Sequence, residues 1–131
     1  MSDAYPAELL YTKDHEWARV EGPAATIGIT RFAVDQLGDI TMVELPKEGA
    51  TFKRGDVIGT VESVKAVSDI YAPLSGKVVK VNDVLENSPE YLNQDPYDEG
   101  WMIQIELSDQ AELKDLMDAT AYVALVEEHG E

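Results

Sequence analysis

Apolar and polar residues alternate along several short segments of this 131-residue chain, and this pattern predicts a protein made mostly of strands. The alternation is clearest at 101–107, where the expected core-facing residues are Trp101, Ile103, Ile105 and Leu107. Further strands are expected at residues 15–21, 25–29, 39–45, 57–64, 67–72 and 77–82, separated by turns rich in Gly and Pro. Many short strands joined by turns indicate an antiparallel β-sandwich or flattened barrel.

Helical patterns lie in the N-terminal half and at the C-terminus. Thr30 is a suitable N-cap for a short helix that stops at Gly38. Asp109 and Glu112 fit a capping box, which predicts C-terminal helices over about 109–128. The polar segment 86–100 is expected to be a loop with one helical turn at 89–92. The length fits a single domain over residues 1–131.

Composition excludes several kinds of chemistry and partner. The chain has no cysteine, so any thiol or disulfide chemistry has to come from an attached group. Its 26 acidic and 10 basic residues give a net charge of −16, which argues against binding to nucleic acid or anionic membranes. From Asp83 onward Lys114 is the only lysine or arginine. This acidic region is either a solvated face or a docking surface for basic partners.

The sequence also bears on location and metals. No stretch approaches the roughly 20 apolar residues of a membrane span. The first residues resemble neither a secretory signal nor a transit peptide, so we expect a cytoplasmic protein, or a mitochondrial matrix protein only if a transit peptide was removed. His15 and His129 lack ligand spacing, so no metal site is expected. We expect a monomer.

Lys65 lies between two strand-like segments. The predicted arms at 57–64 and 67–72 form a hairpin over about 57–72, with Lys65 at its tip. A lone lysine in a turn is usually a solubilising residue. A tip lysine is also exposed on all sides, which suits modification by another protein.

Several motifs carry a resemblance to known carrier proteins. Glu62–Ala66, preceded by Lys53–Gly59 and followed by Ala72–Val78, resembles the attachment region of lipoyl and biotinyl carrier domains. Four further segments, His15–Trp17, Ala25–Thr30, Val43–Pro46 and Tyr97–Ile103, follow in the order and spacing of the H-protein family of the glycine cleavage system. The resemblance covers nearly the whole chain. It implies a lipoyl-type barrel-sandwich extended by terminal helices.

The resemblance also implies a function. Lys65 would carry lipoic acid through an amide bond, placing the dithiolane roughly 12–15 Å from the backbone. The arm would take the aminomethyl group from glycine decarboxylase to the tetrahydrofolate-dependent aminomethyltransferase, and dihydrolipoamide dehydrogenase would reoxidise the dithiol. A lipoate ligase or octanoyltransferase would attach the group. The carrier itself has no turnover and is not an enzyme.

The same resemblance assigns further site residues. Glu62 resembles the acidic residue that lipoylating enzymes recognise. Glu16 and Asp69 match family positions that line the cleft for the loaded arm, although each could equally be a solvated carboxylate. Gln36 replaces a histidine found in some members, and an amide there can hydrogen-bond the arm without titrating.

Three alternatives remain at this stage. A biotinyl carrier is disfavoured because Val64 and Ala66 stand where that family typically has methionines. An H-like carrier that relays lipoyl groups outside glycine catabolism has the same motifs. A stand-alone enzyme is disfavoured because the chain lacks a nucleophile elbow, a zinc-protease helix motif, a phosphate loop and a dinucleotide-binding glycine pattern.

Overall fold

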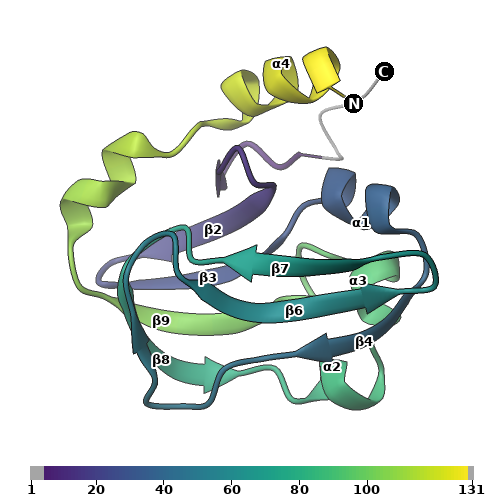
Figure 1. The fold of residues 1–131 in the computed structure, drawn as a ribbon. Coiled ribbons are helices and arrows are strands. Elements are labelled where there is room, and N and C mark those ends of the chain that lie inside the picture. The colour runs from purple at the N-terminus through teal and green to yellow at the C-terminus, as the bar shows by residue number, and fades with distance from the viewer. Residues whose placement is uncertain (1–4, 130–131) are drawn as a thin grey trace.

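The computed structural model describes residues 5–129 and contains two antiparallel sheets that face each other (Figure 1). The larger sheet has the order β1 (Leu10–Tyr11), β2 (Glu16–Glu21), β3 (Ala24–Ile29), β9 (Ile103–Leu107), β8 (Gly76–Val81) and β5 (Thr51–Phe52). The smaller sheet has the order β4 (Ile40–Glu44), β6 (Val57–Ser63) and β7 (Val67–Tyr71). This confirms the mostly β barrel-sandwich with short helices.

Residues 1–4 and the side chain of His129 lie outside the described part of the chain. The expectation about a targeting segment depends partly on residues 1–4. The expectation about metal-ligand spacing of the histidines depends on His129.

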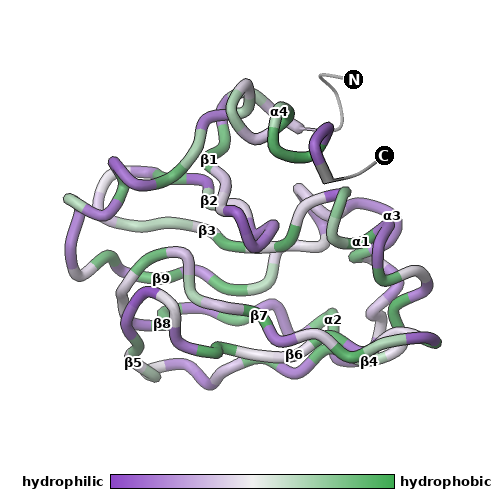
Figure 2. Tube along the Cα trace, turned by 45° about the horizontal axis from the view of Figure 1, so that its top comes forward, coloured by the Kyte–Doolittle hydropathy of each residue, from purple (hydrophilic) through white to green (hydrophobic). Residues whose placement is uncertain are grey.

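The main core fills the space between the two sheets. Val61 and Ile70 from the smaller sheet and Ile27, Val78 and Ile105 from the larger one are at most 4% exposed. Hydrophobic and hydrophilic segments alternate along the strands of both sheets (Figure 2). Period-two alternation gives the smaller sheet one face toward the core and one toward solvent, whereas β3 of the larger sheet is buried from Ala25 to Ile29 and so is covered on both faces.

A second cluster, which we call the aromatic cluster, consists of Leu9, Tyr11, Trp17 and Tyr122. Tyr122 belongs to α4 (Ala119–His129), and its ring stacks on Tyr11 at 4.7 Å between centroids. Its hydroxyl lies 2.7 Å from Thr30 Oγ1 and 2.8 Å from His15 Nδ1. A Cβ on Gly28 would lie 2.6 Å from the Trp17 ring, so glycine is required there. The cluster thus fastens the C-terminal helix to the larger sheet.

The predicted helix boundaries around residues 30–38 are confirmed. Thr30 Oγ1 accepts from the Ala33 N–H at the start of α1 (Arg31–Leu37), and Gly38 ends the helix with a φ of 81°. The helical turn expected at 89–92 overlaps α3 (Tyr91–Gln94), whereas α2 (Val84–Asn87) was not expected. Within residues 5–129, no helix has both the length and the apolar character needed to cross a membrane.

The helices expected over about 109–128 are present: the second is α4, and the first is a short 3₁₀ helix, η2 (Gln110–Asp115). The capping box predicted for η2 is wrong. Asp109 caps η2 through the Ala111 N–H, but Glu112 does not complete a capping box because its carboxylate accepts from the Ser75 N–H and hydroxyl, both at 2.7 Å. A hydrogen bond to a residue distant in the sequence therefore replaces the expected hydrogen bond within the capping box.

The strand predicted over 101–107 begins at Ile103. Met102 is 2% exposed and joins the core, whereas Trp101 is only half-buried and packs under Lys80. The two-residue strands β1 and β5 were not expected, because they are too short to show alternation.

Candidate functional site

Lys65 lies at the tip of the β6–β7 hairpin, in the turn Ser63–Ala66 that we call the hairpin tip. The turn contains no glycine and is held by Ser63 instead. The Ser63 N–H donates to the Ala66 carbonyl at 2.8 Å, and the Ser63 hydroxyl accepts from the Ala66 N–H at 3.1 Å. Val64 is 73% exposed, so the tip extends into solvent as predicted.

The side chain of Lys65 is exposed and makes no hydrogen bond or ion pair with the described residues. Its Cε lies 3.4 Å from where a Cβ on Gly38 would be, so the side chain runs past the end of α1. An accessible primary amine without a competing partner is suited to accept an acyl group. The residues present therefore fit a covalently attached acyl arm.

Glu62 and Asp69 both lie on the solvent-facing side of the smaller sheet. Glu62 pairs with Met42 on β4 and Val67 on β7, and the next row of the same face joins Glu44, Thr60 and Asp69. Directly opposed residues share a face, so these two rows form one surface. We call it the outer face; it is acidic, and apolar where Met42 and Val67 are exposed.

A shallow groove of about 210 Å³ lies beside α1. We call it the helix groove. It is lined by Asp14, His15, Phe32, Ala33, Gln36, Leu37 and Ser68. Because Ser68 faces inward from β7 while its neighbour Asp69 is exposed, the groove has Gln36 in its lining but not Asp69.

A larger groove of about 520 Å³ adjoins the helix groove at Asp14, which lines both. We call it the carboxylate groove, because Glu16 lies in its lining together with Arg54, Asp115 and Met117. Arg54 donates to Asp115 at 2.6 Å, so one wall of this groove is an ion pair.

Glu16 is 2% exposed, not the solvated surface carboxylate that was one of its two interpretations. One carboxylate oxygen accepts from the Thr12 hydroxyl at 2.7 Å, and the other accepts from the Tyr71 N–H of β7 at 3.2 Å. Burial raises the pKa of Glu16 to about 7, against the opposing effect of these two hydrogen bonds. Near neutral pH this group can therefore hold or release a proton.

The structure brings some of the predicted site residues together and separates others. Lys65 and Gln36 lie at the same end of the molecule, because the Lys65 side chain passes the end of α1. Gln36 and Glu16 line adjoining grooves. Glu62 and Asp69 lie on the outer face instead.

Sequence reasoning identified only Gln36 and Glu16 among the residues that line the two grooves, and the residues that it missed include Asp14 and Ser68. Asp14 joins the two grooves, and Ser68 forms the strand side of the helix groove. The period-two pattern of β7 carries a signal for Ser68, since it lies two residues before the buried Ile70. Asp14 has no such signal, because it precedes a residue with a positive φ, His15 at 73°, in an irregular turn.

Comparisons with known proteins agree on one family. The family model described as "Glycine cleavage H-protein" matches residues 9–129. The glycine cleavage system H protein of Symbiobacterium thermophilum is 58% identical over 123 residues, which cover 94% of this chain and 96% of that protein. That of Brevibacillus brevis is 56% identical over 124 residues, covering 95% and 98%.

A solved structure agrees with the sequence matches. The crystal structure of a glycine cleavage system H protein from Mycobacterium marinum superposes with a TM-score of 0.82 at 34% identity. The superposition covers 96% of this chain and 99% of that one.

Proposed function

The chain belongs to the glycine cleavage H-protein family, and we propose that it is the lipoyl carrier of that system, with Lys65 as the attachment residue. The observation that carries this assignment is the free amine at the hairpin tip. Lys65 is exposed, has no polar partner among the described side chains, and passes Gly38 at the end of α1, the helix that lines the helix groove. Proteins of this family carry lipoate.

When bound, lipoic acid supplies the disulfide that takes up the aminomethyl group and the electrons, which a chain without cysteine cannot supply itself. The residues of the chain present, orient and shield that group. We propose that glycine decarboxylase, the aminomethyltransferase and dihydrolipoamide dehydrogenase each receive the hairpin tip in turn.

Glu62 is the recognition residue for the enzyme that attaches the lipoyl group. It lies on the outer face between Met42 and Val67, within one row of strand partners. A lipoate ligase or octanoyltransferase with a basic and apolar surface would match this arrangement. Asp69, in the next row, adds charge to the same surface.

The two grooves provide a place for the arm to lie against the protein. A strand advances about 3.3 Å per residue, so an arm of roughly 12–15 Å laid back along β7 spans about four residues from Lys65. It would thus pass Ser68 and reach the level of Asp69, still short of Tyr71, which binds Glu16. Gln36 and Ser68 of the helix groove are therefore within reach of the arm, whereas Glu16 lies just beyond it.

The relay of lipoyl groups outside glycine catabolism is not favoured, because the relatives are named for the glycine cleavage system. The discriminating experiment is glycine–bicarbonate carbon exchange by a purified glycine decarboxylase. The lipoylated protein should stimulate exchange, and the unmodified protein, as the matched control, should stimulate it far less. Equal exchange with both forms would contradict the proposed function.

A further inference from the structure

The hairpin tip rests on the turn formed by residues 38–40. The Val64 N–H donates to the Asp39 carbonyl at 3.2 Å, and the Lys65 side chain passes Gly38. Gly38 has a φ of 81°, a conformation that a residue with a side chain rarely adopts. The position of the tip therefore depends on how firmly this turn is held.

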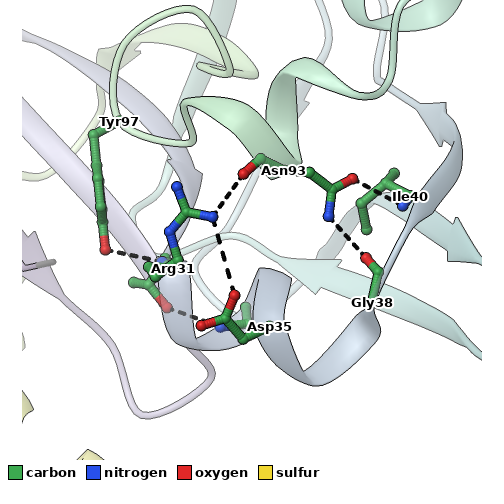
Figure 3. Close-up of polar contacts among 8 residues, drawn as sticks. Arg31, Asp35, Gly38, Ile40, Asn93 and Tyr97 are labelled. Atoms are coloured by element: carbon green, nitrogen blue, oxygen red, sulfur yellow. Dashed lines mark hydrogen bonds and ion pairs between the residues drawn. The ribbon is translucent and has the colours of Figure 1, made fainter.

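The side chain of Asn93 holds this turn from the other side (Figure 3). Its Oδ1 accepts from the Ile40 N–H, and its Nδ2 donates to the Gly38 carbonyl, both at 2.9 Å. Asn93 is itself anchored on α1, because its backbone carbonyl accepts from the Arg31 guanidinium at 2.6 Å. The Arg31 N–H in turn donates to the Tyr97 hydroxyl at 2.9 Å.

One peptide unit connects Asn93 to the tip. The Asp39 carbonyl and the Ile40 N–H belong to the same planar group, and no peptide bond in the described chain is cis. In a trans peptide these two groups point in opposite directions. Asn93 Oδ1, the Asp39–Ile40 peptide and the Val64 N–H therefore form a chain of hydrogen bonds whose members polarise one another.

We propose that Asn93 is a positioning residue for Lys65. Its amide fixes the 38–40 turn, and through the Asp39 carbonyl it fixes the hairpin tip for the enzymes that modify Lys65. An amide is needed because it offers an acceptor to Ile40 and a donor to Gly38 at once. This inference depends on the proposed function only for the role of Lys65.

A purely structural role for Asn93 predicts a different outcome, and Asn82 provides the matched control. The Asn82 amide donates to the carbonyls of Glu99 at 3.0 Å and Trp101 at 2.7 Å, so it also holds a loop. Among the described residues, its side chain makes no hydrogen bond with the 38–40 turn. Asn93→Ala and Asn82→Ala should both lower stability, but only the first should affect the tip.

The first measurement is amide hydrogen exchange by NMR on the unmodified protein. Exchange at Val64 should become about tenfold faster in Asn93→Ala, the change expected when a hydrogen-bond chain loses its anchor. It should match wild type in Asn82→Ala. Asn93→Asp keeps the acceptor for Ile40 and loses the donor to Gly38, so its Val64 exchange rate should lie between those of wild type and Asn93→Ala. This variant also serves if Asn93→Ala does not fold.

The second measurement is kcat/KM for attachment of lipoate to Lys65 by a purified lipoate ligase, at a temperature where every variant is folded. It should fall about tenfold in Asn93→Ala because the acceptor is misplaced, and stay at the wild-type value in Asn82→Ala. Wild-type values for Asn93→Ala, or equal losses in both variants, would overturn the inference. No attachment to wild-type protein would instead contradict the proposed function, while the exchange measurement would still test Asn93.

Discussion

The hairpin tip and the aromatic cluster are built in opposite ways. At the tip, Val64 is 73% exposed, and hydrogen bonds of the backbone and of the Ser63 hydroxyl set the geometry. In the aromatic cluster, all four side chains are at most 1% exposed, and stacked rings and a shared hydroxyl hold them. The hairpin tip buries little surface, so its side chains contribute little to stability and can serve recognition by partner proteins. The aromatic cluster stabilises the scaffold that presents the hairpin tip.

The largest expected effect is on stability, from the aromatic cluster. Tyr122→Ala removes a fully buried ring and the hydrogen bonds of its hydroxyl, so the free energy of unfolding should fall by about 4 kcal/mol. Tyr122→Phe keeps the ring and should cost only about 1–2 kcal/mol. Urea unfolding measures both. The rate of lipoate attachment to the folded fraction of each variant should match that of wild type. Slower attachment would show that the aromatic cluster and the hairpin tip are not independent.

The second expected effect concerns Glu16, which connects β2 to β7. Its pKa is about 7 in the folded protein and 4.5 in the unfolded reference, so the folded state binds the extra proton. The free energy of unfolding should therefore fall as pH rises from about 4.5 to 7. The contribution of Glu16 to this fall is up to about 3 kcal/mol.

Glu16→Gln should remove that contribution, because its neutral amide mimics the protonated acid. Urea unfolding of wild type and variant at pH 5 and pH 8 isolates the difference. The variant should be the more stable protein at pH 8 and close to wild type at pH 5. Parallel pH profiles would show that Glu16 does not titrate in this range.

The third effect concerns the hairpin region and involves the smallest change in the free energy of unfolding. Glu62→Gln removes a charge from the outer face beside Lys65 and should slow lipoate attachment about tenfold. Its stability should stay within about 0.5 kcal/mol of wild type. Glu44→Gln, one row further along the same face, is the matched control and should slow attachment less. Equal slowing would assign the effect to total charge instead of to Glu62.

The sequence predicted best where local pattern and local chemistry agree. Thr30 and Gly38 bound α1 as expected, and the arms around Lys65 pair as a hairpin. It failed where contacts with residues distant in the sequence determine the local structure. Glu112 binds Ser75 instead of capping its own helix, and Trp101 leaves the strand face that alternation assigned to it.

The candidate site shows the same limit. Lys65 was identifiable because a hairpin tip is a local feature. Glu16, Asp69 and Gln36 were assigned to the cleft only because they align with family positions. An aligned position does not show on which side of a strand a groove lies. Asp69 consequently lies on the outer face while Ser68 lines the helix groove. Asn93 has no local signal at all, because its partners lie more than 50 residues earlier in the chain.

Lys65 is the proposed attachment residue for the lipoyl group. Intact-mass analysis of protein made in a lipoylation-competent host tests this assignment most directly, with Lys65→Arg and the control Lys77→Arg measured alongside wild type. One lipoyl increment should appear in wild type and Lys77→Arg and be absent from Lys65→Arg. An increment that persists in Lys65→Arg, or a biotin increment in wild type, would contradict the account.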